Sequence, residues 1–174
     1  MSESQRRALL LDPYPGAQAP IASWLAALQD ARQRTLSAVE DLPARAVDAQ
    51  DERGHAVGTL LYHIAAIEAD WLYTEVLQRA FPPELEPLFP VDVRDDQGRL
   101  APVHGESLAQ HLQRLATVRS ALLADYTSMT AEDFVTPRRL AEYDVSPEWV
   151  LHHLMQHEAE HRSQLVALRD PARS

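Results

Sequence analysis

The sequence contains no cysteine, and it has only five glycines among its 174 residues. Without cysteine the chain has no disulfide, no thiolate nucleophile and no sulfur ligand, so a metal ion would have to be held by imidazole and carboxylate groups. The few glycines form no phosphate-binding loop, which argues against a nucleotide site. We therefore expect any site chemistry to depend mainly on the eight histidines.

The sequence also lacks an apolar run of membrane length and an excess of positive charge. No charged-then-apolar leader precedes the proline and glycine of MSESQRRALLLDPYPG, so we expect a cytoplasmic protein with no membrane partner. The formal net charge is −10, whereas a nucleic-acid-binding protein needs a basic surface that displaces counterions from phosphates. Because 45% of the 174 residues are hydrophobic, we expect one domain over residues 1–174.

Apolar residues recur at helical spacing in four segments of the sequence. These segments predict helices over residues 21–42, 55–79, 107–126 and 146–169. Prolines stand beside the first two segments, at positions where they begin or end helices. Because no alternating strand pattern accompanies the helices, the sequence predicts an all-α fold, a four-helix bundle.

Two of the predicted helices have recognisable N-terminal caps. Ser107 and Gln110 have the spacing of a capping box, and Ser146 followed by Pro147 has the pattern of an N-cap with proline at the first helical position. Between the second and third helices lies FPPELEPLFPVDVRDDQGRLAPVHGE, which is rich in proline and charge. A connection this long predicts a crossover loop that either covers a site or is mobile.

Histidines interrupt the apolar faces of two predicted helices. At about 100° per residue, His157 and His161 fall within the apolar stripe of residues 150–168, and His63 lies at the edge of the stripe of residues 60–71. Buried imidazoles are costly unless each nitrogen has a partner, and residues four apart on a helix can share one metal ion. Three inward histidines from two helices predict a divalent-metal site with an open fourth position, as in catalytic sites.

Other polar residues near these faces leave alternatives open. His153 lies near the same face and is also four residues from His157, so spacing alone does not exclude it as a ligand. Arg32 and Arg119 fall within apolar stripes, and we interpret them as snorkelling at helix surfaces; binding of an acidic substrate in the bundle mouth is the alternative. The remaining histidines are expected to be solvated or at a helix edge, and these are His55, His104, His111 and His152.

The segment QHEAEHRSQL contains H-E-x-x-H, the motif of helix-borne zinc peptidases. Those peptidases take a third ligand from downstream, but only RSQLVALRDPARS follows His161, and no glutamate follows Glu160. A di-iron bundle needs a second E-x-x-H pair, and the candidate Glu52 with His55 lies at or before the start of its helix. The sequence therefore favours neither a peptidase nor a di-iron centre.

Two stretches of the chain resemble a known family. LLYHIAAIEADWL, which contains His63, is similar to the histidine-bearing second helix of the DinB-like, or YfiT-like, metalloenzymes, and HEAEHRSQL is similar to their histidine pair followed by Arg-Gly-Gln. Ser163 stands where that family has the glycine. The resemblance covers the helix order and loop placement of nearly the whole chain. It assigns the metal ligands to His63, His157 and His161, and so excludes His153.

The resemblance implies a bundle, often dimeric, that holds a zinc- or nickel-like ion through three histidines with water completing the shell. The first functional hypothesis is an S-transferase that activates a thiol of the bacillithiol, mycothiol or glutathione type for reaction with a small electrophile. Glu158 would then be a base or an outer anchor for a ligand imidazole. The alternatives are a metal-dependent hydrolase that uses metal-bound water, and a non-catalytic homodimer with a structural metal.

Overall fold

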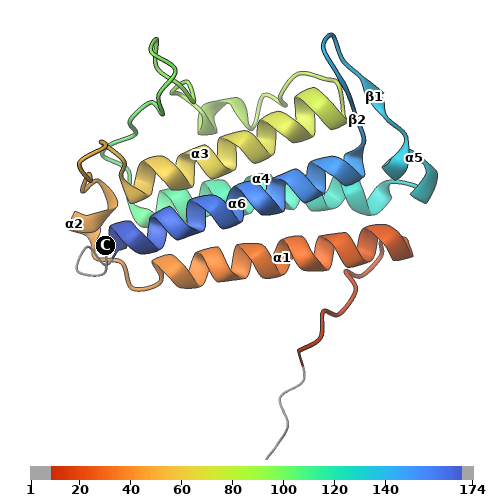
Figure 1. Ribbon diagram of the computed structural model, residues 1–174, viewed down its shortest axis with the longest axis horizontal. Helices are drawn as coiled ribbons and strands as arrows, with labels where there is room; N and C mark the ends of the chain where they lie inside the picture. The colour runs from red at the N-terminus through yellow and green to blue at the C-terminus, as the bar shows by residue number, and fades with distance from the viewer. Residues whose placement is uncertain (1–8, 170–174) are drawn as a thin grey trace, which may run out of the picture.

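In the computed structural model, which describes residues 9–169, four long helices pack side by side as a bundle (Figure 1). They are α1 (Ala19–Val39), α3 (Val57–Asp70), α4 (Leu108–Ser128) and α6 (Pro147–Arg169). Helix α6 packs on both α1 and α3, and α4 packs on the same two helices from the other side. The predicted all-α four-helix bundle is confirmed.

The inward faces of the long helices bury two adjoining groups of apolar side chains. Six of the largest fully buried apolar side chains are Ile21, Leu25, Leu60, Leu122, Tyr126 and Phe134. Their burial drives the packing of the bundle, because removal of apolar surface from water is the main favourable contribution to folding. In residues 9–169, no helix is long and apolar enough to cross a membrane.

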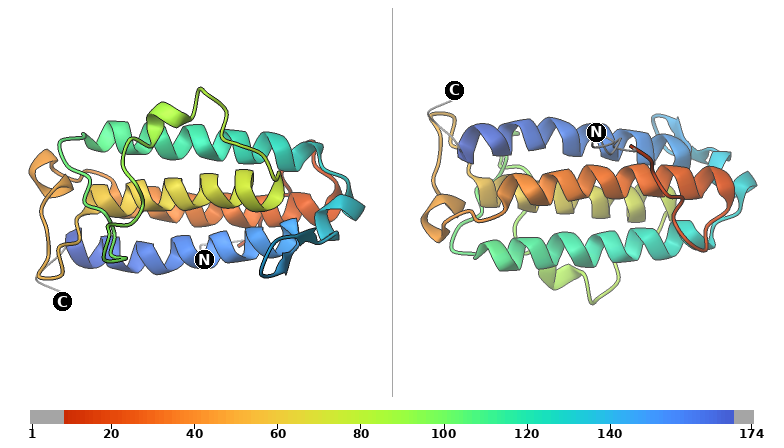
Figure 2. Two further views of the ribbon diagram at one scale, coloured as in Figure 1. Left: turned by 90° about the horizontal axis from the view of Figure 1, so that it is seen from above. Right: turned by 90° about the horizontal axis from the view of Figure 1, so that it is seen from below.

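Helices α3 and α4 run in the same direction, so the chain returns along the bundle between them (Figures 1 and 2). This return is the predicted crossover loop, and it contains the 3-10 helix η2 (Glu86–Leu88). The loop is attached to α3, because the Val103 N–H donates to Thr59 Oγ1 at 3.1 Å and the Val91 N–H donates to Tyr62 Oη at 3.0 Å. These contacts hold the loop against one face of α3.

The predicted starts of α4 and α6 are confirmed. Ser107 and Gln110 form the capping box, in which each side chain bonds the backbone of the other residue. At the start of α6, the Trp149 N–H donates to Ser146 Oγ at 3.2 Å, and Pro147 is the first helical residue. Local side-chain chemistry therefore sets where both helices begin.

The ends of the first two long helices differ from the prediction. Helix α1 ends at Val39 because Asp41 adopts a φ of 58°, a left-handed conformation that stops a helix. The second predicted helix is divided, since α3 continues as a π-helix, η1 (Trp71–Val76), and Gln78 then adopts a φ of 50°. Apolar periodicity indicates which face is buried and does not detect such local changes of helical pitch.

Short elements between the long helices were also not predicted. They are α2 (Ala44–Val47), α5 (Ala131–Val135) and an antiparallel hairpin formed by β1 (Arg138–Arg139) and β2 (Asp144–Val145). Two-residue strands and single-turn helices contain too few residues to show a period. The hairpin and α5 close the end of the bundle where α6 begins (Figure 1).

A histidine assigned to a helix edge lies in the core instead. His111 is 0% exposed, and Arg114 Nη1 lies 3.1 Å from its Nδ1. Gly58 of α3 makes room for the ring, because a Cβ at this position would lie only 2.8 Å from His111 Nε2 and 3.1 Å from Val47 Cγ1. The expectation for His111 was wrong because the missing side chain on α3 admits the imidazole.

Candidate metal centre

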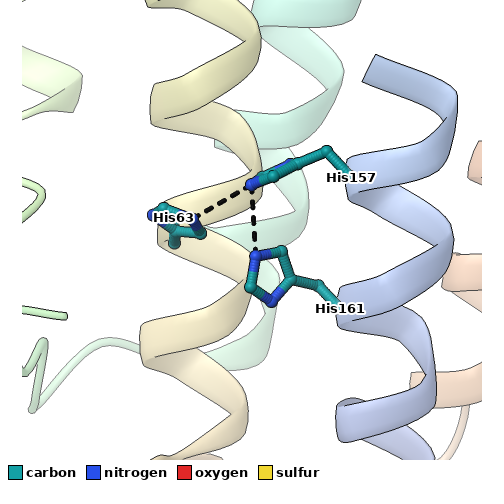
Figure 3. A group of neighbouring side chains, drawn as sticks. All are labelled: His63, His157 and His161. Atoms are coloured by element: carbon teal, nitrogen blue, oxygen red, sulfur yellow. Dashed lines mark hydrogen bonds between the residues drawn. The ribbon is translucent and has the colours of Figure 1, made fainter. Parts of the chain in front are cut away.

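Three histidine side chains meet between α3 and α6 (Figure 3). His63 comes from α3, and His157 and His161 come from adjacent turns of α6. His157 Nε2 lies 3.0 Å from His63 Nε2 and 3.1 Å from His161 Nε2. One nitrogen of each ring lies within 4.8 Å of the other two, so the three predicted ligands form a group that could hold a metal ion.

The apolar neighbours of the histidines set the orientation of both helices. On α6, Leu154 and Leu165 are buried on either side of the histidine pair, at 3% and 0% exposure. On α3, Leu60 and Ile64 are buried beside His63, at 0% and 2% exposure. Because these side chains must face the core, the helical period turns the three imidazoles toward one another.

The surroundings keep the imidazoles uncharged. Burial, with the nearby His161 and Arg94, lowers the pKa of His63 to about 4. Burial, with the nearby His161 and His63, lowers the pKa of His157 to about 3. Burial also lowers the pKa of His161. At neutral pH the three rings are therefore neutral, which is the state in which imidazole binds metal.

Two of the three nitrogen–nitrogen distances and the donor atoms suit a divalent ion, and the third pair lies within 4.8 Å. Tetrahedral Zn–N bonds of about 2.0–2.1 Å separate two nitrogens by about 3.3 Å, and the two Nε2 pairs lie at 3.0 and 3.1 Å. Imidazole suits zinc, nickel, iron and copper. Within residues 9–169 the group contains three histidines and no carboxylate, so a bound ion would keep a position for a ligand from outside the protein.

Comparison with known families agrees with this geometry. The family model of the DinB superfamily matches residues 27–165, which include all three histidines. The chain belongs to the DinB superfamily. A comparison with curated proteins gives no match. The resemblance noted in the sequence is thereby confirmed, together with the all-α bundle that it implied.

In this DinB superfamily protein, Gln164 supports one of the histidines. Gln164 Oε1 lies 3.0 Å from His161 Nδ1. An amide oxygen accepts a hydrogen bond from Nδ1–H, and this leaves His161 Nε2 unprotonated toward the other two histidines. Gln164 is a site residue that was not predicted, although its place three residues after His161 puts it one helical turn away.

His153, which spacing alone left as a possible ligand, lies outside the group of three histidines. Its ring is parallel to that of Trp149, with an interplanar angle of 5° and centroids 5.2 Å apart. The centroid of the Trp71 ring lies 4.4 Å from that of the His153 ring. His153 therefore belongs to an aromatic stack beside the metal centre.

Four charged side chains, one from each long helix, form a buried network in the bundle. Arg32 donates to Glu158 Oε1 at 2.7 Å and to Glu68 Oε2 at 2.6 Å. Arg119 donates to Glu68 Oε1 at 2.6 Å and to Glu158 Oε2 at 3.0 Å. None of the four is more than 6% exposed. Burial alone would raise the pKa of Glu68, but the two guanidinium groups outweigh burial and lower it.

The network corrects the interpretation of Arg32 and Arg119. They were expected to snorkel at helix surfaces, yet both guanidinium groups lie in the core, where two carboxylates neutralise them. Because Glu68 and Glu158 are paired with both guanidinium groups, these groups are not free to bind an acidic substrate. Helical periodicity showed that these arginines face inward, and it contained no information about partners on other helices.

The network also accounts for the glutamate of H-E-x-x-H. Both carboxylate oxygens of Glu158 accept hydrogen bonds from arginines. In the part of the chain that the structure describes, Glu158 makes no hydrogen bond to the three histidines, whose side-chain polar contacts are with one another and with Gln164. The H-E-x-x-H motif therefore places its two histidines on one face of α6 and its glutamate on another face, in the ion-pair network.

Proposed function

We propose that this DinB superfamily protein is a divalent-metal-dependent enzyme that activates a low-molecular-weight thiol for transfer to an electrophile. The observation that carries the proposal is the group of three neutral imidazoles without a carboxylate, formed by His63, His157 and His161. A divalent ion held by these three histidines would lower the pKa of a bound thiol and favour the thiolate at neutral pH. Because the chain has no cysteine, the thiol comes from a second substrate.

In this proposal, Gln164 and Glu158 hold the histidines and helix α6 in position. Gln164 orients His161 through its Nδ1. Glu158 is a positioning residue, because its bonds to Arg32 and Arg119 fix α6 against α1 and α4. Because both of its carboxylate oxygens accept hydrogen bonds from guanidinium groups, Glu158 does not act as a general base in this proposal.

The proposed transfer is a displacement at carbon. With monochlorobimane as the electrophile, the thiolate sulfur attacks the carbon that bears chlorine. The carbon–sulfur bond forms, the carbon–chlorine bond breaks, and chloride leaves with the bonding electron pair. The proton of the thiol passes to the buffer, so no oxidant or reductant is needed.

Monochlorobimane turnover tests this function. Protein purified without a histidine tag and loaded with zinc or nickel is assayed with glutathione, bacillithiol or mycothiol, and with no thiol. We expect acceleration only when metal and one of these thiols are both present. His157→Ala should abolish it, and His152→Ala, an exposed histidine on the same helix, should not.

Two other results would replace the proposal with one of the alternatives. Turnover that is equal without thiol would indicate hydrolysis at the same site. No turnover with any thiol, together with metal removal that lowers only the melting temperature, would indicate a structural metal.

A further inference from the structure

Two tryptophans line a cleft at the end of the bundle where α6 begins. Trp71 is the first residue of the π-helix η1, and Trp149 lies in the first turn of α6. The cleft has a volume of about 720 Å³. Its other walls come from α5, the hairpin and the segments that join them, and consist of Val135, Pro137, Tyr143, Asp144, Val145 and Ser146.

An aromatic stack connects this cleft with the three histidines. Trp149, His153, His157 and His161 follow one another at four-residue steps, so they lie along one side of α6. The His153 ring is parallel to Trp149, and its centroid lies 6.0 Å from that of His157. At 1.5 Å per residue, Trp149 is about 12 Å along the helix from His157. The cleft therefore lies about two helical turns from His157, and His153, which is not among the residues that line the cleft, lies between them.

The backbone and the exposure of the rings suit a binding wall. The π-helix changes the register of α3 at Trp71, and its wider turn is frequent at functional sites. The Trp71 and Trp149 centroids are 5.5 Å apart. Trp149 is 47% exposed, as is Tyr143 on the facing hairpin. Large aromatic side chains thus remain accessible on two sides of the cleft.

The charge of the lining defines the ligand further. Asp144 is the one charged side chain among the residues that line the cleft, and no arginine contributes to its walls. Arg139, whose Nε lies 3.9 Å from Asp144 Oδ1, is not a wall residue, so the walls themselves offer a carboxylated ligand no cation. Indole faces favour flat rings that stack on them, and apolar clefts with few polar groups favour uncharged ligands.

We propose that this cleft binds the electrophilic substrate, and that this substrate is an uncharged compound with a planar aromatic ring. The ring lies against Trp71 and Trp149, with its reactive carbon directed past His153 toward the three histidines. The inference rests on the proposed function for the reaction, but binding to the cleft requires neither metal nor thiol.

Binding is measured with dimethylbimane, which has the ring of monochlorobimane without the chlorine, added to metal-free protein. We expect Trp149→Ala to weaken binding roughly tenfold and Trp149→Phe to retain most of it. Tyr143→Ala tests the facing wall and should also weaken binding. Val166→Ala is the matched control, because Val166 is 46% exposed on the same helix and does not line the cleft.

Kinetics with two electrophiles give a second measurement. Iodoacetamide is small and aliphatic, so it makes little use of the tryptophans. We expect Trp149→Ala to lower the ratio of kcat/KM for monochlorobimane to that for iodoacetamide roughly tenfold, through KM. Val166→Ala should leave this ratio at the wild-type value.

The outcomes separate the cleft assignment from the proposed function. If dimethylbimane binds and Trp149→Ala weakens its binding, but no thiol-dependent turnover occurs, the function fails and the cleft assignment stands. Equal binding to wild type and Trp149→Ala would overturn the assignment. Conversion of a dimer to a monomer by Trp149→Ala, with unchanged bimane binding, would also overturn it and identify a surface for a second copy of the chain.

Discussion

Glu158 Oε1 accepts a hydrogen bond from Arg32 Nε at 2.7 Å, and this contact joins α6 to α1 inside the bundle. The preceding residue, His157, belongs to the candidate metal centre. Successive residues of a helix point about 100° apart, so α6 presents the histidines and the ion pair on neighbouring faces. A rotation of α6 would disturb both, which links the geometry of the metal centre to the stability of the bundle.

Replacing Glu158 by glutamine should destabilise the protein. The change removes one of the two carboxylates that neutralise Arg32 and Arg119 in the core. Breaking a buried charge pair costs about 3–5 kcal/mol, and we expect a loss of about 3 kcal/mol in urea unfolding. The control Glu160→Gln, exposed on the same helix, should change stability by less than about 0.5 kcal/mol. Equal stability of the two variants would show that the network contributes little.

Replacing Gln164 by alanine should weaken metal binding without abolishing it. The amide orients His161 through Nδ1, and loss of such a partner typically weakens metal affinity 10- to 100-fold. We expect roughly a tenfold increase in the zinc Kd, measured by competition with a chromophoric chelator. Gln156→Ala, at an exposed position on α6, is the control. A Kd equal to that of the control would remove Gln164 from the site.

Gly58→Ala should destabilise the protein, although alanine usually stabilises a helix by about 1 kcal/mol relative to glycine. The new Cβ would lie 2.8 Å from His111 Nε2, and His111 is fully buried. Overpacking of this kind costs about 1–3 kcal/mol. In a His111→Ala background the same change should be neutral or stabilising, and a double-mutant cycle in urea measures the difference. A gain in stability in both backgrounds would rule out the clash.

Metal-free protein should become more stable as the pH rises from about 4 to about 6.5. Burial is the largest cause of the low folded-state pKa values of His63, about 4, and His157, about 3. Their unfolded values are about 6.5. Between these values the unfolded chain binds more protons than the folded chain, so the free energy of unfolding increases with pH and levels off above the unfolded pKa.

Urea unfolding with a chelator, at about pH 5 and about pH 7.5, measures this dependence. Substituting both His63 and His157 by glutamine should reduce the difference in unfolding free energy between the two pH values. The same difference in the double variant and in wild type would assign the pH dependence to other groups.

The sequence predicted the bundle and, together with the family resemblance, the three histidines of the candidate metal centre. Capping patterns at Ser107 and Ser146 set two helix starts, and helical periodicity placed three histidines on inward faces. These features depend on residues close together in the sequence or on one helix, where spacing has a direct geometric meaning.

The features that sequence analysis missed depend on contacts between distant residues. Arg32 of α1 is paired with Glu68 of α3. The spacing of residues within one helix does not predict which residue of another helix they contact. Burial of His111 depends on the absence of a side chain at Gly58. Spacing alone left His153 open as a ligand, and the resemblance excluded it. The structure places its ring against Trp71 and Trp149, outside the group of three histidines.

Metal analysis of protein purified without a histidine tag tests the central claim most directly. By inductively coupled plasma mass spectrometry, we expect one divalent ion per chain in wild type and in His153→Ala, because His153 lies outside the group. His157→Ala and His161→Ala should each retain almost none, since each loses one of three nitrogen ligands. Metal contents in these two variants equal to that of wild type would contradict the assignment of the site.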